Sequence, residues 1–119
     1  MNETEAILKV FDSLSEPGED YGMYLIAENI EKECKYSRQE IEKQNIEFFS
    51  NYTIDGKSWQ DVYHIEVDGK KAVAKKRFKL FCKPKPSSKK EPLEYEGHRE
   101  YHLVLENNAW KICGVYELD

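Results

Sequence analysis

Several charged and phenolic side chains in the second half of the chain are spaced so that one face of a sheet would bring them together. If Asp68-Gly69 closes a two-residue hairpin loop, Asp61 lies opposite Lys76 on the neighbouring strand. The next strand would place Tyr101 beside Lys76. We expect the ligand-binding residues of this cluster to be Asp61, Tyr63, Lys76, Tyr95, Arg99, Tyr101 and Tyr116.

This cluster has two interpretations. Either it lines the polar mouth of a pocket, or Asp61 and Lys76 form a partly buried ion pair whose role is purely structural, each charge compensating the other. In a catalytic site, Asp61 would be the general base, and Tyr101 or Tyr63 would donate to a developing oxyanion during enolisation or dehydration. Against catalysis, Lys76 would lower the pKa of the opposite carboxyl group and weaken it as a base.

The histidines do not predict a metal site. His98 and His102 share a strand face, but same-face residues four apart are separated by ~13 Å, too far to hold one ion. His64 would lie two strands away. No nucleotide-binding loop or nucleophile motif is present in the sequence, so we expect no metal and no cofactor.

Charge is distributed unevenly along the chain. The net charge is -5, yet residues 70–90 hold 10 basic and no acidic residues, with Phe81 placed to stack on a base. Glutamates on the expected partner strand, among them Glu94 and Glu100, neutralise much of this run. We therefore consider nucleic-acid binding unlikely and favour a solvated hairpin tip or a contact for an acidic protein.

Four strands are expected between Trp59 and Asp119. The turns at Asp68-Gly69 and Asn107-Asn108 are each flanked by alternating apolar residues, and residues 84–93 form a loop rich in proline and serine. Opposite charges suggest a register for the middle strands with Lys83 opposite Glu94, Arg77 opposite Glu100 and Lys71 opposite Glu106. The core face of this sheet would carry Trp59, Tyr63, Ile65, Phe78, Leu103, Leu105, Trp110 and Ile112. A bulge between Trp59 and Ile65 would reverse the faces on the first strand.

Three helices are expected before the sheet. Apolar residues at helical spacing predict the first over Glu3 to Leu14, ended by Pro17-Gly18. The second is expected over Tyr21 to Cys34, although its start has the alternative of an extended segment. Ser37 begins a capping-box sequence that predicts the third, with a stripe of Ile41, Asn45, Phe48, Phe49 and Tyr52. Residues 51–57 would be a connector.

Length and composition bound the architecture. The chain of 119 residues is 39% apolar, which suits one domain over residues 1–119 with one modest core. No run approaches the ~18 apolar residues of a membrane span, and Cys34, Cys82 and Cys113 lack metal or redox spacing. We expect reduced thiols, no membrane contact and a cytoplasmic location; a trimmed secretory signal or lipid anchor is the alternative.

The order of helices followed by an antiparallel sheet, with a closing hairpin that ends in Trp110-Lys111-Ile112, resembles the NTF2-like (cystatin-like) superfamily. This resemblance implies an α+β fold in which helices pack on a curved sheet of four or more strands, a cone with a cavity, and often a homodimer. The chain departs from the usual pattern because no short strand pair is evident between the second and third helices. A homodimer would use the outer sheet face, where we expect Val62, Val73, Val104 and Val115.

The sequence favours a non-catalytic domain that binds a protein partner, of an adaptor or immunity-protein type. The superfamily also contains isomerases and dehydratases, and no catalytic motif carries over to this chain. The alternative is therefore a small-molecule-binding protein or enzyme with a pocket at the open end of the cone, using Asp61 and Tyr101.

Overall fold

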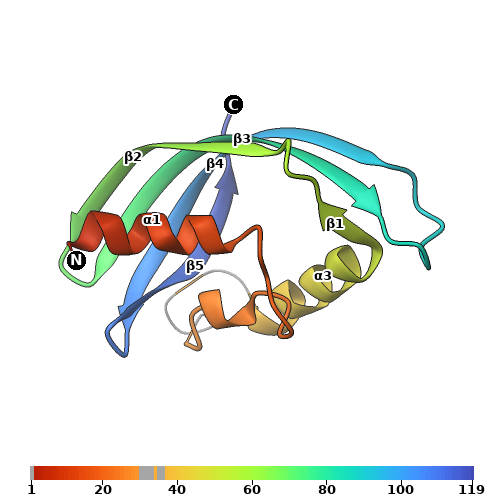
Figure 1. Ribbon diagram of the computed structural model, residues 1–119. Coiled ribbons are helices and arrows are strands. Elements are labelled where there is room, and N and C mark those ends of the chain that lie inside the picture. Colours follow the sequence, from red (N-terminus) through yellow and green to blue (C-terminus); the bar gives the residue numbers. More distant parts are fainter. Residues whose placement is uncertain (1, 30–33, 35–36) are drawn as a thin grey trace.

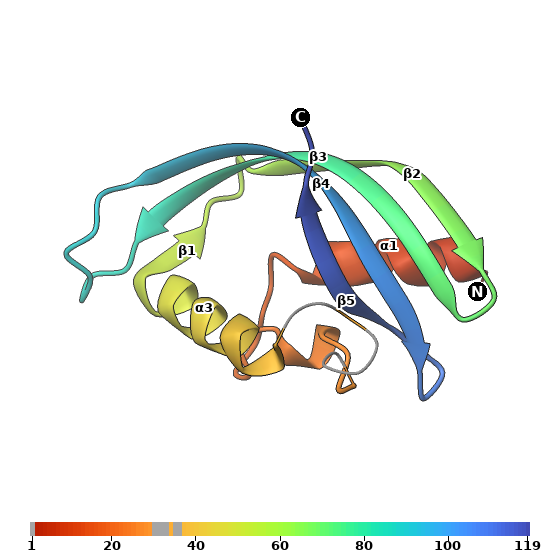
Figure 2. The same ribbon diagram turned by 180° about the vertical axis from the view of Figure 1, so that it is seen from behind.

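The fold is α+β, as the sequence predicts. The computed structural model describes residues 2–29, 34 and 37–119. In this part of the chain, two α-helices lie on the concave side of a curved, open sheet of five antiparallel strands (Figure 1), and the view from behind shows the same two layers (Figure 2). The elements are α1 (Glu3–Ser13), the 3-10 helix η1 (Met23–Leu25), α3 (Arg38–Asn51), β1 (Tyr52–Ile54), β2 (Trp59–Asp68), β3 (Lys71–Pro84), β4 (Leu93–Glu106) and β5 (Ala109–Glu117).

Two strands, β1 and β2, share one long partner at the edge of the sheet. The strand order is β1-β3-β4-β5, and β2 also pairs with β3. β1 pairs with the end of β3 around Cys82, whereas β2 pairs with its beginning. The connector predicted over residues 51–57 therefore contains a strand, which the sequence analysis missed.

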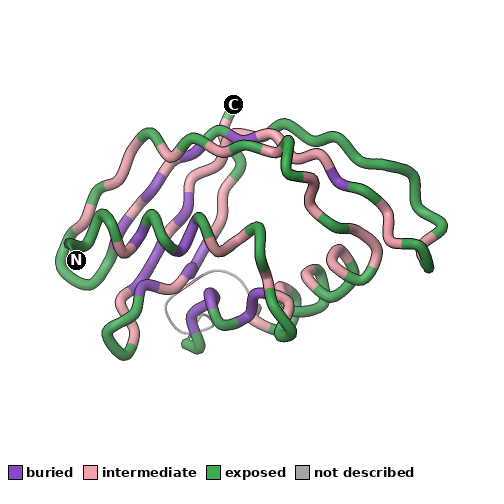
Figure 3. Tube along the Cα trace, in the orientation of Figure 1, coloured by how far each residue is buried: buried purple, intermediate pink, exposed green. Residues whose placement is uncertain are grey.

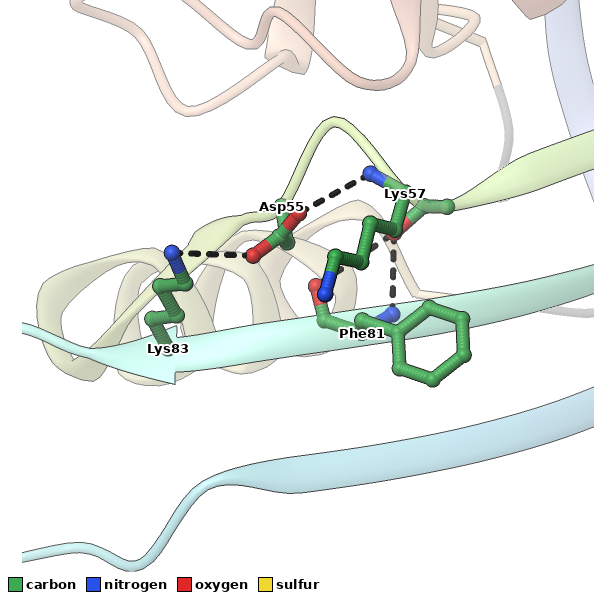
Figure 4. Close-up of polar contacts among 5 residues, drawn as sticks. Asp55, Lys57, Phe81 and Lys83 are labelled. Carbon is green, nitrogen blue, oxygen red and sulfur yellow. Dashed lines mark hydrogen bonds and ion pairs between the residues drawn. The ribbon is translucent and has the colours of Figure 1, made fainter.

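Hydrogen bonds fix the link between β1 and β2 against β3 (Figure 4). The Asp55 backbone N–H donates to the Phe81 carbonyl at 2.7 Å, and the Phe81 N–H donates to the Ser58 hydroxyl at 2.8 Å. The Asp55 carboxylate accepts from the Lys57 N–H and forms an ion pair with Lys83 at 3.0 Å. The Lys57 hydrogen bond, followed by Lys83, lowers the pKa of Asp55. β1 and β2 thus form one interrupted edge of the sheet.

The register of β2 differs from the predicted one in two ways. The loop contains Gly69 and Lys70, so that Ile65 pairs with Ala74 rather than with Ala72. A bulge at Tyr63 then shifts the pairing, and Asp61 pairs with Arg77 rather than with Lys76. Because one extra residue reverses the side-chain alternation, Asp61 and Tyr63 leave the helix side of the sheet. The predicted positions of Trp59 and Tyr63 in the core are also wrong: they are 48% and 42% exposed.

The other two strand pairs are partly as predicted. The pairing of β3 with β4 differs from the predicted register by two residues, so that Lys75 rather than Arg77 lies opposite Glu100. A shift of two residues leaves every side chain on its predicted face of the sheet. The last hairpin pairs Leu103 with Ile112 and Leu105 with Trp110, as predicted. A bulge beyond Ile112 then pairs Tyr101 with Val115, where Gly114 was expected.

The first and third predicted helices are confirmed, and the second is not. Asn2 caps α1 by accepting from the Glu5 N–H at 2.8 Å. Ser37 is the N-cap residue of α3. Within residues 21–29 only η1 is helical, and Ile26 forms a parallel bridge to Ile112 at the edge of β5. Residues 30–33 of the predicted second helix lie outside the described part of the chain.

The core lies between α1, η1 and one half of the sheet. Ile7, Val10 and Phe11 of α1 are buried against β3, β4 and β5, and Figure 3 shows buried residues concentrated there. α3 has no fully buried residue: Ile41 is partly buried against the core, and Phe48 packs on Phe49. This helix therefore lies over the sheet without filling the space beneath it.

The expectation of three reduced thiols is wrong for two of them. Cys34 and Cys113 form a disulfide with a Cα–Cα distance of 5.3 Å, which suits such a bond. Cys113 is buried with Ala27 and Val104, and Cys34 packs against this cluster, whereas Cys82 is a buried free thiol on β3. The link spans 79 residues of sequence, and widely separated cysteines give no local signal of pairing.

Among the described residues, none of the helices combines the length and the apolar character that crossing a membrane requires.

Candidate functional site

A cavity of about 610 Å³ opens between α3, the η1 segment and the concave face of the sheet. This volume is within the range of small-molecule sites. Most of its wall is apolar, formed by Leu14, Pro17, Leu25, Ile26, Ile41, Phe49, Ile54, Trp59, Phe78, Leu80, Ile112 and Val115. Its polar side chains include Gln44, Asn45, Gln60, Lys76, Arg99, Tyr101 and Glu117.

Polar contacts hold the η1 segment in place as one wall of the cavity. The Arg38 guanidinium of α3 donates to the carbonyls of Met23, Ile26 and Ala27. Asn45, about two turns further along the same helix, donates to the Tyr21 carbonyl at 3.1 Å. These contacts satisfy backbone acceptors that an irregular segment would otherwise bury unpaired. The segment is therefore a fixed wall.

Lys76 is a charged side chain of the cavity wall with an unusual environment. It is 6% exposed, and Nζ lies 5.4, 5.0 and 5.0 Å from the ring centroids of Phe11, Phe78 and Tyr101. Nζ donates to the Gln60 side-chain oxygen at 3.0 Å, and the Gln60 amide donates to the Phe11 carbonyl at 2.9 Å. This chain of bonds ties Lys76 to the C-terminal end of α1.

No carboxylate of the described residues forms an ion pair with Lys76. Burial in this aromatic environment, followed by the charge of nearby Arg99, lowers the pKa of Lys76 to about 7. Removing an ammonium group from water is costly unless a counter-charge compensates it. Near neutral pH the side chain therefore exists in both its charged and its neutral form.

Arg99 is the second cation of the site. Its Cζ lies 4.8 Å from the Phe78 centroid, so the two cationic groups approach the same ring. The Arg99 Nε donates to Glu117 at 2.6 Å, and Glu117 is the acidic residue among those that line the cavity. Burial raises the pKa of the neighbouring Tyr101 hydroxyl, although Arg99 opposes this rise, so the phenol stays protonated at neutral pH.

With Lys76 protonated, the lining carries two positive charges and one negative charge. Such a site attracts an anion, and the guanidinium of Arg99 retains donors beyond its bond to Glu117. The apolar walls would accommodate the rest of an amphipathic molecule. The geometry therefore fits recognition of one acidic group at the end of an apolar body.

The structure brings together three of the predicted site residues. Lys76, Arg99 and Tyr101 line the cavity. Tyr95 lies on the same sheet face but outside the lining, where its ring is 5.8 Å from that of Phe78 and its hydroxyl donates to Glu117.

The other three predicted residues lie on the outer face. The bulge on β2 moves Asp61 and Tyr63 there, and the bulge on β5 places Tyr116 opposite Glu100 and beside the ring of His102. Tyr63 hydrogen-bonds His98, and the Arg77 guanidinium stacks on its ring. The expected pairing of Asp61 with Lys76 is therefore wrong, and a general base at Asp61 is remote from this cavity.

Sequence reasoning missed Gln60 and Glu117. Neither residue was named as a candidate, because the bulges on β2 and β5, which turn both toward the cavity, leave no clear trace in the alternation of residues. Asn45 was noted only as part of the α3 stripe; a polar residue within an apolar helix stripe was the signal available for it. Among the described residues, no group of three or more metal-ligating side chains is close enough to hold an ion.

The proposed dimer face also differs from expectation. Val62 and Val115 pack against the helix-side core, and Val104 is buried with Ala27 and Cys113. Of the four valines, Val73 alone keeps a half-buried position on the outer face. A continuous valine patch on that face is therefore absent.

Comparison with known proteins gives a fold and no function. No protein-family model matches the sequence, and no curated protein is similar to it. A SEC-C motif containing protein from Rhodopseudomonas palustris superposes with a TM-score of 0.57 at 9% identity, over 96% of this chain and 77% of that one. A Xanthomonas campestris protein, assigned as a calcium/calmodulin dependent protein kinase II association domain, gives 0.58 at 15% identity, over 96% and 83%. At these identities the similarity is one of fold alone.

Proposed function

We propose that this domain acts by binding a small molecule that has an apolar body and a carboxylate group. The observation that carries the proposal is Lys76, a buried cation at an apolar cavity wall with no carboxylate partner among the described residues. A bound acid would supply the missing counter-charge. Arg99, beside the same Phe78 ring, would hold the second oxygen of the acid.

Binding and protonation are linked in this proposal. The Lys76 pKa of about 7 rises when an anion binds beside it, so the site takes up a proton from solution. Affinity for the acid should therefore fall as the pH rises above 7, because neutral Lys76 offers no charge. A ligand without an acidic group would show no such dependence.

Octanoate and octanamide are matched probes for this site. In titration calorimetry at pH 6.5, octanoate should bind at least about tenfold more tightly than octanamide, a difference of ~1.4 kcal/mol. Lys76→Met and Arg99→Met should each weaken octanoate binding about tenfold or more, since hydrogen bonds to charged groups contribute ~1.5–3 kcal/mol. Lys75→Met and Arg77→Met are the controls, because these neighbours lie on the outer face. Equal affinity for acid and amide, or equal effects of inner and outer substitutions, would reject the proposal.

We also propose membership of the NTF2-like superfamily, which the helices on a curved antiparallel sheet support. The protein partner and the homodimer expected from the sequence stay predictions.

A further inference from the structure

We infer that Lys76 is a covalent capture site for aldehydes and ketones, whose carbonyl carbon its amine attacks to form an imine inside the cavity. This inference rests on the proposed function in using the same cavity. It adds a chemical class of ligand, an amphipathic molecule that carries a carbonyl group.

The first argument is the position of the amine. Lys76 is 6% exposed and lines a cavity large enough for a small ligand, whereas its strand neighbour Lys75 lies on the outer face opposite Glu100. Gln60 holds Nζ at the wall through a 3.0 Å hydrogen bond. A long side chain that is otherwise flexible is thus held in one place.

The second argument is the state of the amine. Only a neutral amine has the lone pair that attacks a carbonyl group, and most lysines are protonated at pH 7. Burial among three aromatic rings removes the ammonium from water, and this desolvation, followed by the nearby Arg99 charge, lowers the pKa of Lys76 to about 7. A desolvated lysine beside a second cation is a known way to activate this nucleophile.

The reaction is balanced without an oxidant or a cofactor. The Nζ lone pair forms a C–N bond to the carbonyl carbon, and the carbonyl π electrons move to oxygen. Both amine hydrogens end on that oxygen, which leaves as water when the C=N bond forms. An iminium produced by protonation carries its positive charge between the faces of Phe11, Phe78 and Tyr101, and these cation–π contacts offset part of the desolvation cost that the ammonium also meets.

Arg99 would position a ligand that carries both a carboxylate group and a carbonyl group. Its guanidinium and Nζ of Lys76 lie 4.8 and 5.0 Å from the centroid of the Phe78 ring. An acid group bound at Arg99 would therefore leave a carbonyl group of the same molecule within reach of Lys76. Amphipathic oxo acids fit both demands.

Reductive trapping tests the inference on the intact protein. The protein is incubated with octanal and sodium cyanoborohydride at pH 7, and the alkylated lysines are located by peptide mass spectrometry. Lys76 should be labelled at least about tenfold faster than Lys75, since roughly half of its amine is neutral at pH 7 against about one in 3,000 for an ordinary lysine. Octanoate should slow labelling of Lys76 and not of Lys75, and Lys76→Arg should abolish the fast label.

Each outcome bears on a different claim. If octanoate binds but Lys76 is labelled no faster than Lys75, the covalent inference is wrong and the proposed binding function stands. If octanoate fails to bind and Lys76 is not labelled, both are wrong. Fast labelling that octanoate does not slow would support the covalent site and reject the carboxylate ligand.

Discussion

Replacing Lys76 with methionine should stabilise the protein at low pH, and the gain should fall as the pH rises. In the unfolded chain the amine has its ordinary pKa of 10.5, whereas burial and the Arg99 charge lower the pKa to about 7 in the fold. Between these values the unfolded chain binds a proton that the native state lacks, so the free energy of unfolding rises with pH. Below pH 7 the wild type therefore bears the whole cost of the buried charge.

The magnitude follows from the pKa difference. At ~1.36 kcal/mol per pH unit, the cost of charging Lys76 is about 5 kcal/mol below pH 7. Methionine removes this cost but leaves the Gln60 oxygen without its donor, which costs ~1–3 kcal/mol. The net gain at pH 6 should be roughly 2–4 kcal/mol, and it should fall by about 3 kcal/mol between pH 6 and pH 9.

Urea unfolding of the wild type and the variant at four pH values between 6 and 9 measures this difference. Lys75→Met is the control, because it removes a lysine from the outer face of the same strand and should show no comparable pH dependence. If the difference between wild type and Lys76→Met were constant across this range, Lys76 would have an ordinary pKa. The argument from burial would then be wrong.

Two further substitutions test the packing of the sheet and the disulfide. Gly97→Ala would place a Cβ 2.4 Å from the buried Phe78 ring, so the free energy of unfolding in urea should fall by ~1–3 kcal/mol. Gly56→Ala is the control, because its Cβ would have no atom within 4 Å; equal effects of the two substitutions would contradict this packing. Cys113→Ser should remove the bond to Cys34 and cost about 2–5 kcal/mol, and dithiothreitol should lower the melting temperature of the wild type but not of this variant.

Local patterns in the sequence predict much of the fold. The helical spacing of Ile7, Val10 and Phe11 and the capping-box sequence that begins at Ser37 were sufficient to predict α1 and α3. The Asn107-Asn108 turn fixed the last hairpin near its loop, where both asparagines have positive φ. The second predicted helix failed because its apolar residues serve an irregular wall that Arg38 and Asn45 hold from α3. That wall depends on tertiary contacts and has no local signature.

The site was predicted only in part, for a related reason. Lys76, Arg99 and Tyr101 lie on stretches of β3 and β4 where a two-residue error in register leaves each side chain on its face. Asp61 and Tyr116 lie beyond bulges, where one extra residue moves a side chain to the opposite face. A bulge adds no distinctive residue type at Tyr63 or Cys113, so the alternation of the sequence could not locate it.

The most direct test of a cavity that recognises acids through Lys76 is the titration of this one amine. Lysine labelled with ¹³C at Cε, assigned with the Lys76→Met variant, gives the pKa by NMR with and without saturating octanoate. We expect a midpoint near pH 7 without octanoate, because of the burial of Lys76, and a midpoint above pH 8 in its presence. A midpoint near 10.5 in both samples, or one near 7 that octanoate leaves unchanged, would contradict the account.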